Sequence, residues 1–342
     1  MRICTWNIEW FDDLFNGDDS FADGTREIYV DRKLQEIGYD EIRAAIAEII
    51  QLIDPDAIMV IEAPGTTATT GKTTIQCLQN FSQHFGLRLD GVLMGYASRG
   101  RQEIALWYDP NKLEASHDPM FDQDDRMNGP FDEEFIIDSD LDGIKEIYTH
   151  FRPPLEAKIA PKPDGDPFWM VGVHAKSKGI FSKNDLLNYR REVAKNRRRL
   201  FAECGHIRRR VEMMLDAGKP TIVLGDINDG PGMDYAELRF GRSAVELIMG
   251  SVFEPTRILA SHVGEPEWGN RGFEPSSARF RDRFTEDYVN VLIDHILASN
   301  DIGVAEDNPH LVWNPHQTDE LKPHRRTFTL ASDHFPITLD LA

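Results

Sequence analysis

The sequence predicts an α/β fold in which mixed β-sheets form a sandwich with helices on the outside. In the first part of the chain, segments with helical spacing of apolar residues alternate with strand-like apolar runs, as in sheets that helices cover. Further along, strand-like runs follow each other with turns between them, which indicates hairpins and argues against a purely parallel sheet. A chain of 342 residues is long enough to bury a large core, as one α/β domain or as two smaller ones.

The N-terminal elements follow from apolar spacing and from the residues at their ends. Residues 2–8 fit a strand that begins the fold at once. Isoleucines at helical spacing then predict a helix that begins with Asp40 as its cap and ends before Pro55. Residues 56–62, DAIMVIE, indicate a buried strand that ends at Glu62.

The later elements are predicted in the same way. Apolar residues from Ile75 to Phe85 indicate a helix that Gly86 ends, with Thr73 or Thr74 as its cap. The remaining predictions are, in chain order, strands at 91–95, 103–109, 155–159 and 168–175, a long helix at 184–217, a strand at 221–228, and strand-like runs at 289–297 and 328–342.

The charge of the chain is strongly negative and unevenly distributed. A net charge of −20 argues against sequence-independent binding of nucleic acid, because such binding depends on Lys and Arg to neutralise the phosphates. It leaves room for an enzyme whose positive potential is local or carried by a metal. Residues 114–146 are rich in Asp and Glu, and we expect an inserted, partly irregular loop there, either solvated or holding a cation. Residues 190–210 are rich in Arg, and we expect this helix to pair with the acidic segments.

The cysteines and the N-terminus bear on the compartment. Cys4, Cys77 and Cys204 are far apart and have no metal-binding spacing, so we expect buried thiols in a reducing compartment rather than a thiol nucleophile. No apolar run reaches the length of a membrane span. The first residues, MRICTWNIEWF, lack the apolar region of a secretory signal. We therefore expect a cytoplasmic protein, with a secreted mature form left open.

Two segments resemble ligand-binding loops but fail on spacing. The stretch EAPGTTATTGKTT at 62–74 resembles a phosphate-binding loop, but five residues separate Gly65 from Gly71 where that loop needs four. We expect no nucleotide cofactor there, and a Thr-rich loop that caps a helix instead. The stretch at 226–237 resembles an EF-hand calcium loop, but its Gly comes one residue too early and no helix precedes it.

Polar residues of a few types stand where the predicted strands end. Loops at strand ends are where α/β scaffolds place their sites. Carboxylates and Asn suit a hard cation such as Mg²⁺, and a His oriented by a carboxylate suits acid–base chemistry near neutral pH. Each residue alone is equally typical of a turn or of a satisfied polar group, so the prediction rests on the set. Its members are Asn7, Glu62, His174, Asp226, Asn228, Asp294, His295, Asp333 and His334.

These residues belong to a set of longer motifs, which are TWNIEWF, IMVIEAP, FRPPLEAKI, VGVHAKSKG, VLGDINDGPG, LIDHIL and ASDHFPI. In order and type, these motifs resemble those of the endonuclease/exonuclease/phosphatase family of metal-dependent phosphoesterases, which includes pancreatic-type deoxyribonuclease. The resemblance spans residues 3 to about 337 and implies a single domain over 1–342. It implies a four-layer α/β/β/α sandwich of two mixed, mostly antiparallel sheets, with the site at one mouth of the packed sheets.

The resemblance also implies a role for each matching residue on the metal side. Glu62 is expected as the principal Mg²⁺ ligand, with Asn7 near the metal or the phosphate. Glu9 falls where some members keep an acidic outer-shell residue, and Asp333 is expected to complete the metal side. Mn²⁺ or another divalent cation remains an alternative to Mg²⁺.

On the substrate side, the resemblance implies hydrogen-bond donors and proton carriers. His174 and Asn228 are expected to donate to the phosphoryl oxygens, and Asp226 to orient or deprotonate the attacking water. Asp294 is expected to hold His334, whose action as base or acid stays open. Arg152 stands where nucleases place a phosphate-contacting Arg, and Lys176 is a further candidate. The chain departs from the family pattern at Ile227 and His295, which removes no group that the chemistry needs.

The sequence favours a phosphodiesterase that acts on nucleic acid, without excluding other phosphoesters. Lys176 and Lys178 of the KSK run, a His/Arg-rich loop at 305–327 and the alternating arginines of ARFRDRF at 278–284 are each open to a role in binding a phosphate backbone or to a solvated surface role. A phosphatase or phospholipase-like hydrolase of small or lipid headgroup phosphates is the alternative, and a catalytically silent binding protein of the same fold is another. Protein partners stay undetermined.

Overall fold

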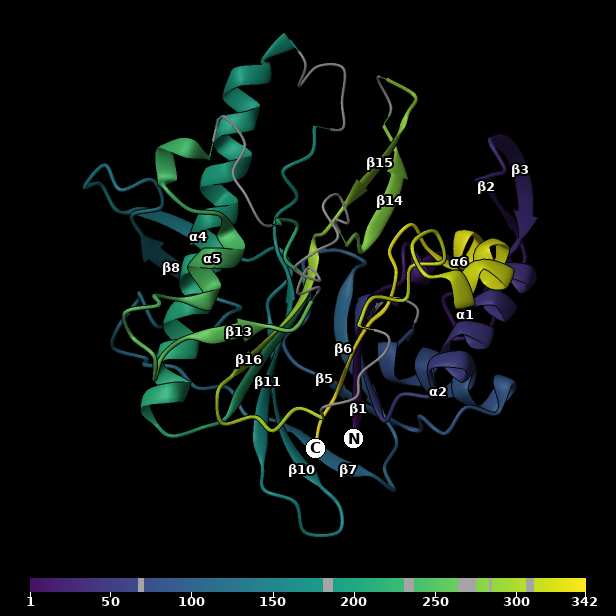
Figure 1. The fold of residues 1–342 in the computed structure, drawn as a ribbon, viewed down its shortest axis with the longest axis horizontal. Helices are drawn as coiled ribbons and strands as arrows, with labels where there is room; N and C mark the ends of the chain where they lie inside the picture. The colour runs from purple at the N-terminus through teal and green to yellow at the C-terminus, as the bar shows by residue number, and fades with distance from the viewer. Residues whose placement is uncertain (67–70, 181–186, 231–236, 264–274, 283–284, 306–310) are drawn as a thin grey trace.

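Two β-sheets pack face to face, and helices cover the outer face of each sheet (Figure 1). The computed structural model describes residues 1–66, 71–180, 187–230, 237–263, 275–282, 285–305 and 311–342. The two chain termini lie side by side at one end of the sandwich (Figure 1), where the Leu341 amide donates to the Met1 carbonyl.

The first sheet has five strands in the order β17–β1–β4–β6–β5. Its neighbours run antiparallel except for β1 and β4, which are parallel. Helices α1, α2 and α6 cover its outer face (Figure 1). The elements are β1 (Arg2–Asn7), β4 (Ala57–Ala63), β5 (Gly91–Met94), β6 (Glu103–Tyr108), β17 (Ile337–Asp340), α1 (Tyr39–Ile53), α2 (Thr74–Phe85) and α6 (Arg325–Ala331).

The second sheet has six strands in the order β13–β16–β12–β11–β10–β7. It too contains one parallel pair, β11 with β12, among antiparallel neighbours. Helices α4 and α5 cover its outer face (Figure 1). The elements are β7 (Leu113–His117), β10 (Leu155–Pro161), β11 (Phe168–His174), β12 (Thr221–Asp226), β13 (Leu259–Ser261), β16 (Asp294–Ser299), α4 (Tyr189–Asp216) and α5 (Ala244–Met249).

Alternation along the strands builds three apolar layers. In β4, Ile58 and Val60 face the helices of the first sheet, while Met59 and Ile61 face the second sheet, as expected for side chains that alternate across a strand. Gly172 in β11 keeps the two sheets close, because a Cβ there would clash with the Met59 sulfur. The four layers confirm the predicted α/β/β/α sandwich of mixed, mostly antiparallel sheets.

Small hairpins and single-turn helices extend beyond the sandwich. The β2–β3 and β14–β15 hairpins project from the end of the molecule opposite the termini (Figure 1). The elements are β2 (Thr25–Val30), β3 (Lys33–Gly38), β8 (Glu134–Ile137), β9 (Glu146–Thr149), β14 (Ala278–Arg281), β15 (Tyr288–Val291) and the 3₁₀ turns η1 (Phe11–Leu14), η2 (Leu238–Phe240) and η3 (Asp319–His324).

The structure corrects several predicted elements near the C-terminus. The run 289–297 is not one strand, because β15 ends at Val291 and β16 begins at Asp294 in another sheet. The start of 328–342 is helical, since Phe328 and Leu330 pack into the core from α6. The His/Arg-rich stretch 305–327 is likewise not simply a loop, because it contains η3 and the start of α6. Its residues 306–310, with His310, lie outside the described residues, as do 184–186 of the predicted long helix.

Of the two predicted helix caps, one is confirmed and one is wrong. Thr73 caps α2, because its hydroxyl accepts the Gln76 amide at 3.1 Å. The cap predicted at Asp40 is wrong, because Gly38 holds the N-cap position of α1 and no side chain caps the helix. Lys72 of the phosphate-loop look-alike before α2 is buried and donates to Asp12 Oδ1 at 2.6 Å, so its ammonium serves the fold.

The acidic insertion is ordered by the Arg-rich helix. It contains β8 and part of β7 and β9, so it is less irregular than predicted. Arg210 of α4 forms a fully buried ion pair with Glu156 of β10 and donates to the Gly129 carbonyl at 2.7 Å. Arg198 lies 3.7 Å from Asp140. The predicted pairing of these two segments is confirmed.

The three cysteines lie inside the fold. Cys4, Cys77 and Cys204 are buried and form no disulfide, and burial raises the pKa of each thiol, which makes them poor nucleophiles. Within the described residues, no helix combines the length and the apolar character that a bilayer crossing requires.

Candidate active site

The site lies where the parallel pairs of the two sheets end. β1 and β4 of the first sheet end in Asn7 and, near its end, Glu62, while β11 and β12 of the second sheet end in His174 and Asp226. Neighbouring parallel strands present their carboxyl ends at the same edge. Contacts across the two sheets confirm the convergence, because Asn7 Nδ2 donates to Asp226 Oδ2 at 3.1 Å and His174 Nε2 lies 4.0 Å from Glu62 Oε1.

Local backbone irregularities aim two of these carboxylates. The β4–β6 register shifts between Ile61 and Ala63, and Glu62 has a φ of 63°, which is the effect of a bulge that reorients one side chain. Gly225, before Asp226, has a φ of 135°, and a Cβ there would clash with the Val173 carbonyl oxygen. Only glycine fits this close passage between β11 and β12.

Asp226 is the centre of a buried hydrogen-bond network. Its Oδ1 accepts the Asn228 backbone amide at 2.8 Å, and its Oδ2 accepts the side-chain amides of Asn7 and Asn228, each at 3.1 Å. Burial and the neighbouring charge of Asp294 raise the pKa of Asp226 to about 7. A carboxylate with this pKa is suited to take up a proton near neutral pH.

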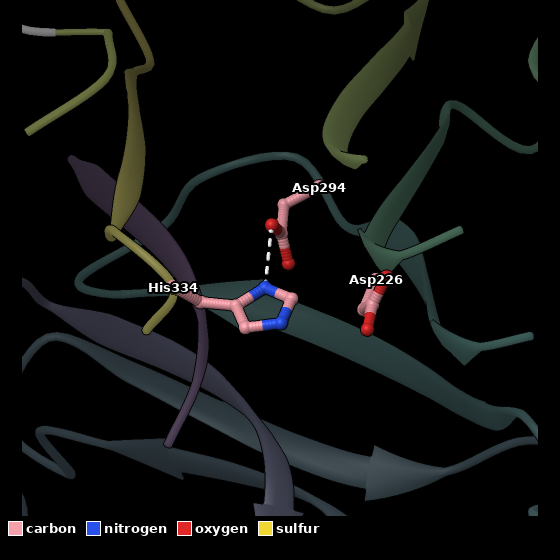
Figure 2. A group of neighbouring side chains, drawn as sticks. All are labelled: Asp226, Asp294 and His334. Atoms are coloured by element: carbon pink, nitrogen blue, oxygen red, sulfur yellow. Dashed lines mark hydrogen bonds and ion pairs between the residues drawn. The ribbon is translucent and has the colours of Figure 1, made fainter. Parts of the chain in front are cut away.

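His334 is held by a carboxylate from another strand (Figure 2). Its Nδ1 lies 2.8 Å from Asp294 Oδ2, which also accepts the Ser277 hydroxyl at 2.7 Å. Figure 2 shows the imidazole between Asp294 and Asp226, with its other nitrogen turned toward Asp226. Burial lowers the pKa of His334, but the charge and hydrogen bond of Asp294 and the charges of Asp226 and Asp333 raise it well above the ordinary value.

Arg152 fixes the tautomer of His174. Its Nη1 lies 2.8 Å from His174 Nε2 and 2.9 Å from Gln102 Oε1, and its Nη2 donates to the Ala175 carbonyl. A guanidinium only donates, so His174 Nε2 accepts and the proton sits on Nδ1. That Nδ1 is buried without a partner in the described part of the chain. Burial and the charges of Arg152 and His334 lower the pKa of His174 well below its ordinary value, so its imidazole is neutral.

The two lysines of the KSK run have different surroundings. Lys178 donates to Asp229 Oδ1 at 2.5 Å and lies 2.9 Å from Glu237, so it is tied into the fold. Lys176 is partly buried, and burial and the charge of Arg152 lower its pKa. Of the two, only Lys176 stands beside the site residues.

A second set of acidic side chains lies on the other side of the site. Glu9 is partly buried, and burial, Asp333 and Glu62 raise its pKa to about 8, although Arg26 opposes the shift. Burial also raises the pKa of Asp333, and Glu62 and Asp294 add to it. Glu62 thus raises the pKa of both Glu9 and Asp333, against the opposing charges of Arg26 and His334.

This acidic set suits a divalent cation. Asn7 Oδ1 is buried and has no hydrogen-bond partner among the described residues. Glu62 Oε2 accepts the Trp10 amide at 3.0 Å, which leaves its other oxygen facing His174. Carboxylate and amide oxygens are the ligands of Mg²⁺ and Mn²⁺. The residues predicted to hold the metal, namely Glu62, Asn7, Asp333 and Glu9, therefore have the right chemistry.

Two other groups of possible ligand atoms lie close together. The contacts of the first group favour proton transfer over metal binding, and those of the second favour a role in folding. Asp226, Asp294 and His334 place ligand atoms within 4.8 Å of one another, but the His334 Nδ1 proton is already shared with Asp294, which suits proton transfer. Asp138 and Asp140, with Asp142, form the second group. Arg198 supplies a positive charge beside Asp140, so we assign that group to the pairing of the insertion with α4.

Some residues that shape the site were not anticipated. Ser332 accepts the Glu9 and His334 amides and donates to the Asn7 carbonyl at 2.8 Å, which fastens the His334 segment to β1. Ser277 likewise holds Asp294, because its hydroxyl accepts the Asp294 amide at 2.9 Å and donates to Asp294 Oδ2. Neither stands out in the sequence, because serine is common in turns. His295 lies off the site and contacts the Asp229 carbonyl at 2.9 Å, and Ile227 is buried core.

Comparison with known proteins gives a similarity of overall architecture. No protein-family model matches the chain, and no curated protein matches its sequence. Among similar solved structures, an endonuclease/exonuclease/phosphatase family protein from Bacteroides thetaiotaomicron has a TM-score of 0.46 and 14% identity, covering 100% of this chain and 97% of that one. That protein bears the name of the family that the sequence motifs resemble.

Two further structures are similar at the same level. A mannosyl-6-phosphatase from Bacteroides thetaiotaomicron has a TM-score of 0.44 and 15% identity, covering 100% of this chain and 99% of that one. The D. rerio protein TDP2, complexed with a single-strand DNA product, has a TM-score of 0.44 and 12% identity over 100% and 98% of the chains.

Proposed function

We propose that the protein is a Mg²⁺-dependent phosphodiester hydrolase, and that it acts as a nuclease. The observation that carries the proposal is the meeting of a hydrogen-bonded His334–Asp294 pair, the buried Asp226, and the Arg152–His174 pair at one edge of the sandwich. Next to them lies the acidic set of Glu62, Asp333 and Glu9, with Asn7 Oδ1, which has no hydrogen-bond partner among the described residues. A phosphoester hydrolase needs a positioned water, donors for the phosphoryl oxygens and compensation of charge.

Glu62, Asn7 and Asp333, with Glu9 behind them, would hold the metal. Once bound, Mg²⁺ would withdraw charge from the phosphoryl group and from the oxygen that leaves. Mn²⁺ or another divalent cation fits the same oxygens.

Asp226 and His334 would carry the proton transfers. Asp226 is oriented by Asn7 and Asn228, so it would take the proton of the attacking water. Asp294 keeps the His334 Nδ1–H bound and leaves Nε2 to face the substrate. His334 would therefore donate from Nε2 to a phosphoryl or leaving oxygen. Of the two roles open to it, base or acid, we assign His334 that of the acid.

Arg152 and Lys176 would stabilise the negative charge of the phosphoryl oxygens. Arg152 is held by Gln102 and Ala175, and such fixed donors need little reorganisation. Asn228 would add a further donor. His174 would offer its Nδ1–H.

A phosphatase of small or lipid headgroup phosphates is the second candidate. The net charge of −20 favours it, since a long polyanion meets general repulsion from such a chain. The two candidates use the same residues and differ in the substrate.

A substrate screen with metal supplementation tests the proposal. The purified protein is assayed with Mg²⁺ or Mn²⁺ against single- and double-stranded DNA, RNA, bis(p-nitrophenyl) phosphate and sugar or inositol phosphates. We expect metal-stimulated cleavage of the phosphodiesters, with Glu62→Ala and His334→Ala each slower by at least about 10²-fold. Hydrolysis of the monoesters alone would exclude the nuclease.

Matched controls separate catalysis from folding. Glu27→Gln, an exposed carboxylate of β2, removes one acidic charge away from the site and is expected to retain wild-type rates. Thermal unfolding and far-UV circular dichroism should show that all variants are folded. Near-normal turnover in folded Glu62→Ala or His334→Ala would disprove the assignment of the site.

A further inference from the structure

A group of arginines without acidic partners lies beside the candidate active site. Arg279 in β14 donates its backbone amide to the Asp333 carbonyl at 2.8 Å, and Ala278 forms a β-bridge with His334. The backbone of Arg279 thus lies beside that of Asp333, the residue before His334. Arg32, at the turn between β2 and β3, and Arg325, at the start of α6, come from elements that are remote in sequence.

The contact of Arg281 with the Tyr29 ring at 4.4 Å brings the β14–β15 and β2–β3 hairpins together, and the charges of Arg32 and Arg325 reach Arg279. Burial lowers the pKa of Arg279, and the charges of Arg32 and Arg325 add to the effect, against the opposing influence of Tyr288. The same charges act on His316, because burial and the charges of Arg279 and Arg325 lower its pKa to about 4. Like charges gather in this way where an anion is to be bound.

The group differs from its neighbours in forming no ion pair in the described part of the chain, although the charge of Arg325 helps to lower the pKa of Asp319. Arg326, the next residue after Arg325, lies 2.7 Å from Glu41, and Arg281, two residues after Arg279, lies 2.9 Å from Glu286. No described acidic side chain forms an ion pair with Arg32, Arg279 or Arg325.

Neutral contacts hold the guanidinium groups in place. Arg279 stacks 4.5 Å from the Tyr288 ring and donates to Asn290 Oδ1 at 2.9 Å. Arg325 donates its Nε to the Pro315 carbonyl at 2.9 Å. Their positive charge is therefore oriented but not neutralised, as in a guanidinium that awaits a phosphate.

We propose that Arg32, Arg279 and Arg325 form a second phosphate-binding site, which holds a phosphate of a nucleic-acid strand next to the phosphodiester that is cleaved. The proposal rests on the proposed function and names its substrate as a strand with several phosphates. The β2–β3 and β14–β15 hairpins project from the sandwich at this end (Figure 1), and Arg281 of β14 contacts the Tyr29 ring of β2 at 4.4 Å. Together they form a wall along which a strand runs away from His334. The local positive charge allows binding despite the acidity of the whole chain.

Binding without turnover tests the proposal. A fluorescein-labelled single-stranded DNA of about ten nucleotides is titrated in EDTA and read by fluorescence anisotropy. Arg279→Gln and Arg325→Ala are each expected to weaken binding about tenfold. Each is also expected to lower the slope of log Kd against log salt by about 0.7. Arg326→Ala, the same charge loss beside the site but on a residue paired with Glu41, is expected to bind like the wild type.

Kinetics and competition identify the source of the second phosphate. With Mg²⁺ present, the ratio of the KM for the oligonucleotide to the KM for bis(p-nitrophenyl) phosphate is expected to rise about tenfold in Arg279→Gln. Unlabelled oligonucleotide is expected to displace the probe, and tripolyphosphate to compete poorly. Tight competition by tripolyphosphate together with weak oligonucleotide binding would overturn the assignment to a strand.

The failures of the two proposals are distinct. Arg32→Ala changes an exposed turn residue and tests the group without touching the core. If the wild type binds no oligonucleotide, or if Arg32→Ala, Arg279→Gln and Arg325→Ala all bind like Arg326→Ala, the second phosphate site is disproved while hydrolysis of bis(p-nitrophenyl) phosphate still stands. If no phosphodiester is hydrolysed with any metal, the proposed function fails whatever the binding data show.

Discussion

Left-handed backbone conformations occur at three residues around the site. The φ angles are 52° at Trp10, 63° at Glu62 and 57° at Asn228, although such values are costly for residues other than glycine. Each is held by hydrogen bonds: the Trp10 amide donates to Glu62, Arg26 donates to the Trp10 carbonyl, and the Asn228 amide donates to Asp226. The strain aims side chains at the site, and at Trp10 and Glu62 it depends on partners that are distant in the chain.

The Asp294–His334 pair leads to a prediction on catalysis. Asp294→Asn removes the charge that binds His334 Nδ1–H and raises the pKa of the imidazole, and its amide can donate to Nδ1, so the imidazole would lose its Nδ1 proton or turn away. We expect kcat for phosphodiester hydrolysis to fall by about 10²-fold or more with little change in KM. Steady-state kinetics measure the loss, and ¹⁵N chemical shifts of the imidazole report which nitrogens are protonated.

The control for that prediction removes a neutral contact to the same carboxylate. Ser277→Ala deletes the hydroxyl that donates to Asp294 Oδ2 at 2.7 Å but retains the negative charge beside His334. We expect a much smaller loss of kcat and the wild-type protonation of the imidazole. An Asp294→Asn variant with unchanged imidazole protonation and unchanged kcat would show that the pair has no role in the reaction.

At the scale of elements, the segment before α2 resembles a phosphate loop in sequence, but its Lys72 links it to η1 through an ion pair with Asp12. Lys72 Nζ donates to Asp12 Oδ1 and to the Asp12 carbonyl of η1, and Asp12 Oδ1 also accepts the Gly65 amide. Both side chains are nearly buried, with relative exposures of 6% and 11%. Lys72→Met is expected to lower the free energy of unfolding by about 3 kcal/mol, because it leaves Asp12 buried without its cation. Urea denaturation measures the change.

A double-mutant cycle completes this test. Asp12→Asn combined with Lys72→Met removes both charges, and we expect the double variant to be more stable than the sum of the single changes by about 1 kcal/mol or more. Since neither residue belongs to the active site, phosphodiester hydrolysis should persist in the folded fraction. A Lys72→Met variant with wild-type stability would contradict the role of the ion pair.

Elements were predictable where local pattern and tertiary packing agree. β4 and α2 follow from an apolar run and from helical spacing; β4 ends one residue after the predicted Glu62, and Gly86 caps α2 as expected. The run 289–297 misled because Leu292 and Ile293, where the chain passes between sheets, are apolar like many of the strand residues on either side, so nothing local marks the break. The short helix α6 was missed because its seven residues offer too few turns to display a period.

At the scale of the whole molecule, the site depends on contacts that no local pattern encodes. The residue types at strand ends were predictable from the sequence, and their family resemblance supplied an order of roles. The contact from Asn7 to Asp226 spans 219 residues, and that from His334 to Asp294 spans 40. Such pairings arise from how the two sheets align, and residues such as Ser277 and Ser332 gain their importance only through them. The unpaired arginine group likewise emerges only in three dimensions.

A buried histidine pair makes the stability of the molecule sensitive to pH. His206 Nε2 lies 3.2 Å from the Gly129 carbonyl, so Nε2 carries the proton and Nδ1 accepts from His150 Nε2 at 3.1 Å. Both rings are neutral, and Phe131 and Phe135 pack against them. Burial and the charge of Arg210 lower the pKa of His206 to about 3, and burial and His206 lower the pKa of His150 well below 6.5.

Because the pKa of both histidines is lowered in the folded chain, acidification destabilises the fold. Above pH 6.5 the histidines are neutral in the folded and the unfolded chain, so they do not penalise folding. As the pH falls below 6.5, the unfolded chain binds protons that the folded chain refuses, and stability is lost progressively toward the folded pKa values. Each histidine contributes a loss of up to about 1.4 kcal/mol per pH unit in this window.

A comparison of two variants isolates this contribution from that of the carboxylates, several of which oppose it. His150→Phe removes one titrating ring but keeps an aromatic group, so the slope of unfolding free energy between pH 6.5 and 5 should flatten by about 1.4 kcal/mol per unit. Phe135→Leu disturbs the same cluster, since Phe135 packs 4.2 Å from the His206 ring, but it removes no titrating group. It should lower stability equally at all pH values in the window, as measured by urea denaturation. Parallel curves for His150→Phe and the wild type would mean that His150 is protonated within the folded molecule.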